Sequence, residues 1–230
     1  MINGSALEQI AHIENGFHSK FGVPFQSNVA PKVRGTIVFE EKYRDPQMLR
    51  GLEEFSHIWL IWGFSENRQT GWKTTVRPPR LGGNTRKGVF ATRSPFRPNP
   101  LGLSSVQIER IEIHQILGSI IHVLGADLMN GTPIYDIKPY IAFTDSRPNA
   151  LGGFSKDFES RHLKVVMCRD FGEYFPKNEM DNLENILACD PRPQYHNDSS
   201  RVYGMEYGGF EIKFRVEGDV LFVLEVVERI

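Results

Sequence analysis

Short apolar runs separated by proline and glycine constrain the fold of this chain more than any other feature of its sequence. Apolar residues alternate over residues 104–113, and a similar run over residues 119–128 predicts a hairpin through Gly118. The other expected strands cover residues 33–39, 55–64, 88–92, 134–141, 210–216 and 220–227. Few helices separate these runs, whereas a doubly wound sheet alternates strands with helices. We therefore expect a mostly-β or α+β fold, built on a small β-barrel or strongly curved sheet and not on a Rossmann fold.

Two helices are expected outside these strands. Asp45 offers an N-cap and Pro46 a first helical position, so a short helix is expected to run to about Leu52. A second helix is expected over residues 178–188, in the C-terminal part of the chain.

The composition is that of a globular protein, with 40% of the 230 residues apolar and 24% charged. The sequence becomes polar and loop-like after about residue 144, so we expect one domain over residues 1–145 and a smaller one over residues 146–230. No apolar run approaches the ~20 residues of a membrane span, and the first residues carry no recognisable secretory signal. We therefore expect no membrane association and a cytoplasmic location.

No metal site is expected from the metal-binding residue types. Cys168 and Cys189 show no metal-ligand spacing and no CxxC motif, and the seven histidines form no HExxH motif.

A basic segment lies between Glu66 and Glu109, because no acidic residue occurs between these two positions. Its cations are Arg68, Lys73, Arg77, Arg80, Arg86, Lys87, Arg93 and Arg97. A field of one sign indicates an anionic partner, and arginine suits bidentate phosphate contacts. Trp72, Phe90 and Phe96 lie among these cations and could stack on unpaired bases. Charge alone leaves open a second interpretation, in which the loop is solvated and its cations pair with distant carboxylates.

The amino-acid sequence of this segment and of three flanking stretches resembles that of a known family. Residues 76–103 read VRPPRLGGNTRKGVFATRSPFRPNPLGL, with RGLEEFSHIW at 50–59, DLMNGTPIYDIKPY at 127–140 and DPRPQY at 190–195. This pattern resembles the TsaA/TrmO family of S-adenosylmethionine-dependent tRNA (adenine-N6)-methyltransferases, closely over residues 10–145 and loosely beyond. The resemblance implies a single-sheet β-barrel catalytic domain, a small C-terminal α+β domain and a homodimer. It also implies N6-methylation of threonylcarbamoyladenosine (t6A) at tRNA position 37, next to the anticodon.

The resemblance further implies a binding site for S-adenosylmethionine. The matching positions are Gln26, Ser27, Asn28, Ser65, Glu66, Arg93, Leu103, Leu124, Gly125, Ala126 and Asp127. Ser27-Asn28 replaces a family Pro-Gly, although asparagine can still adopt a left-handed turn. Ser65 stands where the family has histidine, so only backbone contacts remain available there, and Ala126 replaces a leucine. Asp127 is expected to take ribose hydroxyls or the amino group, with a role as a turn residue as the alternative.

Three residues of the DIKPY stretch are candidates for catalysis. Asp136 and Lys138 could remove a proton or anchor the substrate, and the alternative is an ion pair at a strand end. Tyr140 could stack or donate a hydrogen bond, and core packing is its alternative. The candidates for RNA binding are Arg77, Arg80, Arg86, Lys87 and Arg97. Two other functions stay open, namely a non-catalytic RNA-binding module and a methyltransferase that acts on a non-tRNA substrate.

Overall fold

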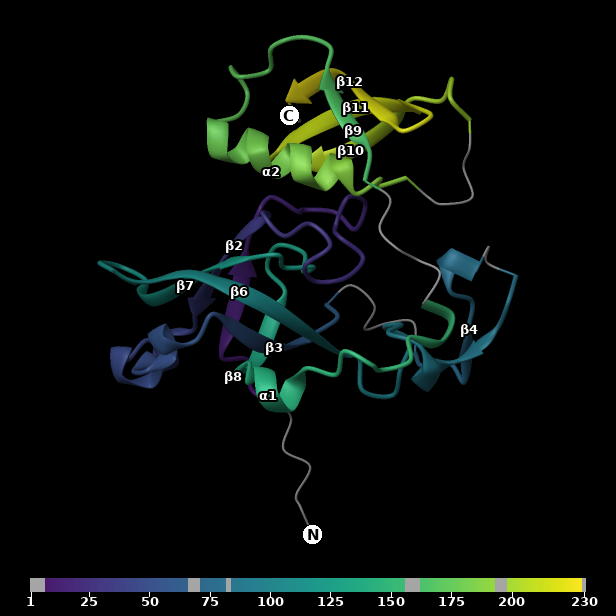
Figure 1. The fold of residues 1–230 in the computed structure, drawn as a ribbon. Helices are drawn as coiled ribbons and strands as arrows, with labels where there is room; N and C mark the ends of the chain where they lie inside the picture. Colours follow the sequence, from purple (N-terminus) through teal and green to yellow (C-terminus); the bar gives the residue numbers. More distant parts are fainter. Residues whose placement is uncertain (1–6, 66–70, 82–83, 156–161, 193–197, 229–230) are drawn as a thin grey trace.

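The computed structural model describes residues 7–65, 71–81, 84–155, 162–192 and 198–228. Within these residues, six antiparallel strands form a closed barrel in the order β1-β2-β7-β6-β3-β8 (Figure 1). The strands are β1 (Ala11–Glu14), β2 (Arg34–Phe39), β3 (His57–Gly63), β6 (Leu101–His114), β7 (Gly118–Leu124) and β8 (Pro133–Pro139). This architecture confirms the expected β-barrel.

Alternation along the strands determines which side chains fill the barrel. Ile58 and Leu60 of β3 are fully buried, because every second residue of a strand points to the same face. On the paired strand β6, Ser104 and Val106 are buried, whereas Leu103 is 55% exposed on the outer face. The hairpin from β6 to β7 forms as expected, with Gly118 at φ 68° opposite His114.

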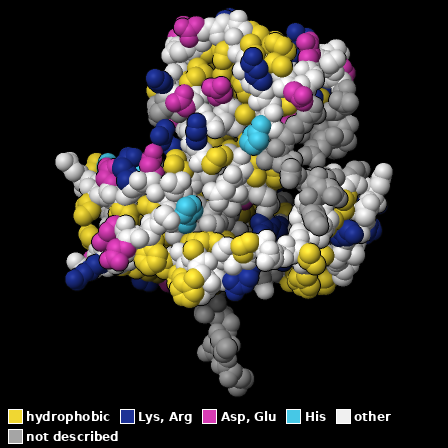
Figure 2. Space-filling view, in the orientation of Figure 1, with side chains coloured by type: hydrophobic (Ala, Val, Ile, Leu, Met, Phe, Trp, Pro, Cys, Tyr) yellow, Lys and Arg dark blue, Asp and Glu magenta, His cyan; other side chains and the backbone are white. Residues whose placement is uncertain are grey.

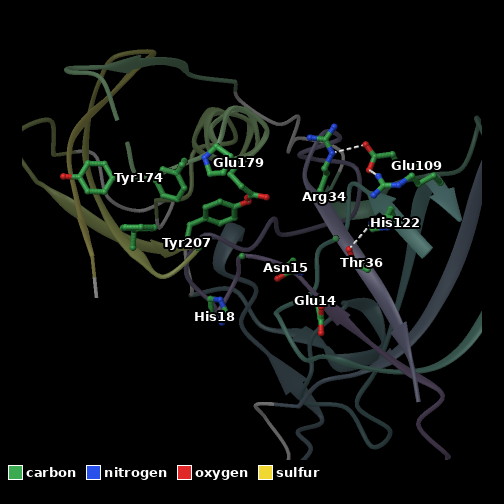
Figure 3. Close-up of a pocket in the computed structure, with 17 residues that line it drawn as sticks. Glu14, Asn15, His18, Arg34, Thr36, Glu109, His122, Tyr174, Glu179 and Tyr207 are labelled. Carbon is green, nitrogen blue, oxygen red and sulfur yellow. Dashed lines mark hydrogen bonds and ion pairs between the residues drawn. The ribbon is translucent and has the colours of Figure 1, made fainter. Parts of the chain in front are cut away.

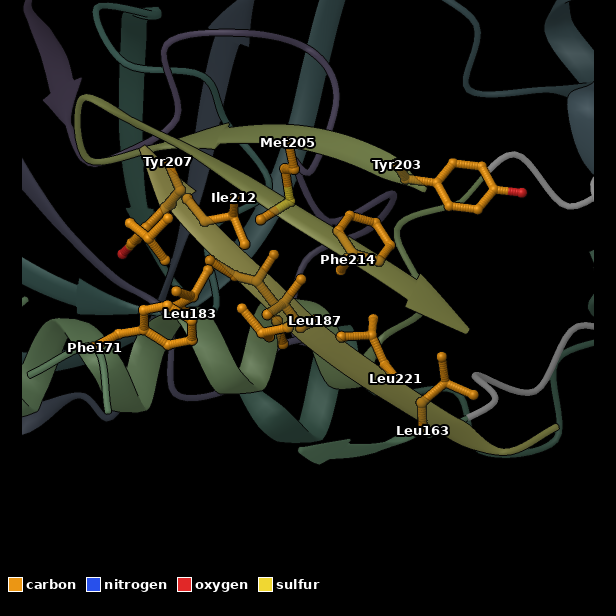
Figure 4. Close-up of a cluster of buried hydrophobic side chains, with 14 of the residues drawn as sticks. Leu163, Phe171, Leu183, Leu187, Tyr203, Met205, Tyr207, Ile212, Phe214 and Leu221 are labelled. Atoms are coloured by element: carbon orange, nitrogen blue, oxygen red, sulfur yellow. The ribbon is translucent and has the colours of Figure 1, made fainter. Parts of the chain in front are cut away.

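The C-terminal domain is a four-stranded sheet in the order β10-β11-β12-β9, with one helix against it (Figure 1). Its elements are β9 (Lys164–Met167), α2 (Lys177–Ala188), β10 (Tyr203–Tyr207), β11 (Phe210–Glu217) and β12 (Val220–Glu228). Leu183 and Leu187 of α2 pack with Ile212 and Phe214 of β11 in a buried cluster (Figure 4). The expected small α+β domain is therefore present.

Part of the N-terminal segment packs into the core of the C-terminal domain. Phe17, Ala30 and Val33 belong to the same buried cluster as the C-terminal sheet. The rings of Phe17 and Tyr207 meet edge to face, with their centroids 5.5 Å apart. This packing joins the barrel to the C-terminal domain, and the expected boundary between residues 145 and 146 stays a prediction.

Two local expectations were wrong. The helix expected after Asp45 is a pair of 3-10 turns, Pro46–Leu49 and Leu52–Glu54, because Gly51 between them has φ 87°. The strand expected at residues 88–92 is reduced to a two-residue strand, and a 3-10 turn follows it. The short elements are β4 (Thr75–Val76), β5 (Lys87–Gly88), α1 (Ala142–Asp145) and the 3-10 turns Glu41–Tyr43, Pro79–Leu81, Val89–Ala91 and Gly153–Ser155.

The strands β1, β9 and β10 were not anticipated. Each has only four or five residues, which is too short for a clear alternation signal. Within the described ranges, no helix combines the length and the apolar character that crossing a lipid bilayer requires.

Candidate functional site

A cavity of about 760 Å³ gathers several of the residues that the resemblance implies for cofactor binding, and we name it the Asp127 cavity. The members of that set that line it are Gln26, Ser65, Arg93, Leu103 and Asp127. Aromatic side chains of Trp62, Phe64 and Phe90 line the same space. Residues from four separate stretches of the chain therefore meet around one carboxylate.

A chain of hydrogen bonds inside the barrel orients this carboxylate. The indole Nε1 of Trp62 donates to Ser104 Oγ at 2.9 Å, and Ser104 Oγ donates to Asp127 Oδ1 at 2.5 Å. Because the hydroxyl has a single proton and accepts from Trp62, that proton is directed at Asp127. Trp62 and Ser104 are both buried, so this chain is shielded from competing water. It orients one oxygen of the carboxylate, and backbone hydrogen bonds from Ser27 and from Asp127 itself also act on this group.

Opposing effects act on the charge of Asp127. Burial raises the pKa of its carboxyl above the usual value, whereas the hydrogen bond from Ser104 and the charge of Arg93 lower it. No lysine, arginine or histidine in the described part of the chain forms an ion pair with Asp127 within 4.0 Å. Asp127 is the carboxylate that lines this cavity, together with the cations Lys20, Arg93 and Arg97, so both signs of charge are available to a ligand.

The turn at Asn28 supports one wall of the cavity. Asn28 adopts the left-handed conformation with φ 62°, as the sequence allows, and its backbone N–H donates to the Gly125 carbonyl at 2.9 Å. Gly125 has φ 79°, and a Cβ there would lie 2.6 Å from Asn28 Oδ1, so glycine is required. Five of the positions implied by the resemblance do not line the cavity: Ser27, Asn28, Leu124, Gly125 and Ala126. Glu66 lies outside the described residues.

The basic segment borders the Asp127 cavity and a second, larger opening. This basic crevice has a volume of about 1220 Å³ and separates the basic segment from the residues that follow α2. It is lined by Lys73, Arg77, Arg86 and Arg93, whereas Arg97 lines the Asp127 cavity. The side chain of Arg80 and all of Arg68 lie outside what the structure describes.

The cations of the basic segment have neutral partners. Arg97 Nη1 donates to the Thr92 carbonyl at 3.0 Å, Arg86 Nη1 donates to Thr75 Oγ1 at 2.6 Å, and Arg93 donates to Gln26 Oε1. The Lys87 ammonium lies 5.8 Å from the centroid of the Phe154 ring. Among the described residues, no carboxylate forms an ion pair with Lys73, Arg77, Arg86, Lys87, Arg93 or Arg97. The basic segment was expected either to bind an anionic partner or to pair its cations with distant carboxylates. The described residues do not support the second interpretation.

The three catalytic candidates do not line the Asp127 cavity, although Lys138 and Tyr140 are neighbours of Trp59, which does. Lys138 Nζ and Asp136 Oδ2 form an ion pair at 2.8 Å, and both side chains are substantially exposed. They sit on the outer face of the barrel, because they pair with Ile61 and Trp59, which alternate along β3 with the buried Ile58 and Leu60. Tyr140 packs near Trp59 with ring centroids 5.5 Å apart. The structure thus shows the ion pair that was the alternative for Asp136 and Lys138, and their catalytic role stays a prediction.

Two residues of the site were not anticipated from the sequence. Ser104 and Trp62 each follow the inward register of a strand, and a serine at an inward position among apolar residues was the available signal. No group of three or more histidine, cysteine, aspartate or glutamate side chains in the described residues is arranged to hold a metal ion.

Comparisons with known proteins match the whole length of the chain. A family model for the tRNA-methyltransferase O N-terminal domain matches residues 12–146, and one for the TrmO C-terminal domain matches residues 172–229. A tRNA (adenine(37)-N6)-methyltransferase of Escherichia coli K12 is 36% identical over 231 residues, which cover 95% of this chain and 97% of the relative. A Pseudomonas aeruginosa protein named "Putative S-adenosylmethionine-dependent methyltransferase RcsF" is 34% identical over 96% of this chain and 97% of its own length. The crystal structure of TrmO from the same species superposes with a TM-score of 0.78 at 29% identity, over 100% of this chain and 99% of that one.

Proposed function

The chain belongs to the tRNA-methyltransferase O (TrmO) family, and from this premise we propose that it transfers a methyl group from S-adenosylmethionine to N6 of adenosine 37 in tRNA. One observation carries the proposal beyond family membership. The oriented carboxylate of Asp127 lies in a cavity that adjoins a segment of cations without carboxylate partners in the described residues. A cationic donor and an anionic RNA are the two ligands that such a pair of neighbouring sites complements.

Residues of the Asp127 cavity are suited to hold the donor. S-adenosylmethionine, when bound, supplies an activated methyl group on a positively charged sulfur. Asp127 would accept hydrogen bonds from its amino group or ribose hydroxyls, and Trp62, Phe64 and Leu103 would provide apolar walls that exclude water. Arg93, whose guanidinium donates a hydrogen bond to Gln26, would lie between the donor and the RNA.

Catalysis in this proposal depends mainly on alignment. Holding two reactants in line can contribute up to ~7–11 kcal/mol to the rate in favourable cases. We propose t6A as the substrate because its N6 lies between a purine ring and a carbonyl, which makes the N6 proton unusually acidic. A weak proton acceptor then suffices, and Asp136, Lys138 and Tyr140 remain the candidates from the family resemblance.

A homodimer in the cytoplasm is the assembly that we propose. Its support is the exposure of large apolar side chains, of which Leu103 of β6 is 55% and Phe143 of α1 is 87% exposed. A second copy that covers such side chains could bring Asp136 and Lys138, which lie on the outer face of the barrel, to the cavity of its partner. Light scattering coupled to size-exclusion chromatography tests the dimer directly.

The decisive experiment combines the protein, labelled S-adenosylmethionine and two tRNA pools, one with and one without t6A. We expect label only in the pool that contains t6A, and nucleoside mass spectrometry should place it on N6 at position 37. Labelling of both pools alike would reject t6A as the substrate. If the protein binds tRNA but takes up no S-adenosylmethionine in a calorimetric titration, it is a non-catalytic RNA-binding module instead.

A further inference from the structure

The basic crevice has two walls from distant parts of the chain. Lys73, Arg77 and Arg86 of the basic segment form one wall, and residues 189–192, which follow α2, form the other. In Figure 1 the basic segment, which holds β4, lies beside the barrel and below the C-terminal domain. The C-terminal domain therefore contributes one wall of this basic crevice.

The charge of this crevice is not compensated from within. Asp190 is the acidic residue that lines it, and both of its oxygens are bound to Arg192, at 2.7 Å to Nε and 2.8 Å to Nη2. This pair is neutral as a whole, so the cations of the opposite wall keep their charge. A crevice with this balance attracts a polyanion.

A second crevice between the two domains has the opposite character. Figure 3 shows Arg34 paired with Glu109, at 2.9 Å between Arg34 Nε and Glu109 Oε1, and Glu109 also binds Arg110. Tyr207, on the opposite wall, donates to Glu179 at 2.9 Å. Figure 2 shows acidic and basic side chains mixed on this side of the junction, over β6 and β7. Since its cations are neutralised internally, this crevice offers no comparable attraction to an anion.

The basic crevice is continuous with the Asp127 cavity. Pro24, Phe25, Gln26, Phe90 and Arg93 line both of them. Phe90 is 77% exposed at this junction and can stack on a base, while the guanidinium of Arg97 lies 6.0 Å from its ring centroid. An RNA strand whose target base meets the donor at the mouth of the Asp127 cavity therefore has a direct path into the basic crevice.

We propose that the basic crevice holds the nucleotides next to the target adenosine, and that the C-terminal domain forms one wall of this RNA site. This inference rests on the proposed function. The bidentate pair of Asp190 and Arg192 gives that wall a fixed shape, because it closes the turn at Asp190, whose φ is 51°. The C-terminal wall thus limits the path of the RNA strand, and the wall formed by the basic segment supplies the positive charge.

Substitutions of opposite charge at Pro191 distinguish an effect of charge on tRNA binding from an effect of a disturbed fold. It lines the C-terminal wall and is partly exposed, so Pro191→Lys adds one positive and Pro191→Glu one negative charge inside the crevice. Glu184→Gln is the matched control, because it changes the charge of the same domain by +1 at an exposed position of α2 outside the crevice. Each variant is assayed for the Kd of tRNA and, separately, for the Kd of S-adenosylmethionine.

We expect Pro191→Lys to lower the Kd of tRNA and Pro191→Glu to raise it, each by about fivefold, the size for unit charges ~4 Å apart in water. Glu184→Gln should leave it unchanged, and the Kd of S-adenosylmethionine should stay constant throughout. A loss of affinity in both Pro191 variants, or no change in either, would overturn the inference. If the wild-type protein still methylates tRNA in that case, the proposed function stands and only the placement of the RNA is rejected.

Discussion

Replacing Ser104 by alanine is the sharpest test of the proposed cofactor site. The change removes the hydroxyl that donates to Asp127 at 2.5 Å and leaves the Trp62 indole without its acceptor. A hydrogen bond to a charged group contributes about 1.5–3 kcal/mol, so we expect the Kd of S-adenosylmethionine to rise by about ten- to hundredfold. The tRNA affinity should change little, because neither Ser104 nor Trp62 lines the basic crevice.

The pH dependence of this variant separates an orienting role from simple loss of packing. Burial already raises the pKa of Asp127, and the hydrogen bond from Ser104 opposes that shift, so removal of this bond should raise the pKa further. Arg93 lines the same cavity, and its positive charge lowers this pKa in both proteins. If ionised Asp127 binds the donor, affinity falls as pH drops through this pKa. The Ser104→Ala variant should lose affinity at a higher pH than the wild type.

Calorimetric titrations from pH 5 to pH 9 provide the assay. Ser105→Ala is the matched control, because Ser105 is the next residue of β6, points outward and does not line the cavity. Equal Kd values for Ser104→Ala and wild type, or a weakened Kd with an unshifted pH profile, would refute the reasoning. A melting temperature measured for both variants shows whether the barrel itself is intact.

Three further outcomes are expected. Asp127→Asn should weaken S-adenosylmethionine binding in calorimetry, and an unchanged Kd would remove Asp127 from the site. Arg97→Ala should weaken tRNA binding and lower the salt slope of log K by ~0.7–0.9 for a lost phosphate contact; an unchanged affinity and slope would remove Arg97 from the RNA surface. Burial raises the pKa of the Cys189 thiol to about 11, so at pH 7 maleimide should modify the exposed Cys168 well before Cys189. Peptide mass spectrometry after timed quenching would contradict this if both cysteines reacted at the same rate.

The strands that were predicted correctly are those with a strong local signal. The β6–β7 hairpin and the two C-terminal strands β11 and β12 show clear alternation, and the barrel has the expected strands of 33–39 and 134–141 as β2 and β8. The helix expected at residues 178–188 is α2. The turns near Gly51 and Val89 were mistaken for longer elements, because a positive φ or a 3-10 turn interrupts a segment whose composition still suits a helix or strand.

Only part of the candidate site could be predicted from the sequence. The family resemblance singled out Asp127, Arg93 and Gln26, which do meet in one cavity. It did not single out Ser104, whose importance depends on the inward register of β6 and on a partner 23 positions away. Nor could it show that Asp136 and Lys138 pair with each other on the outer face of the barrel.

The sequence by itself determined the strand pattern, the stiffness of a loop rich in proline and glycine, and the single sign of its charge, because each depends on neighbouring residues. Only the tertiary structure decided which charges remain uncompensated. Arg34 is neutralised by Glu109, 75 positions away, whereas Arg77 has no such partner in the described residues. The packing of Phe17 against Tyr207 likewise joins segments that the sequence keeps far apart. Ion pairs and core contacts depend on distance in space, and the path of the folded chain determines that distance.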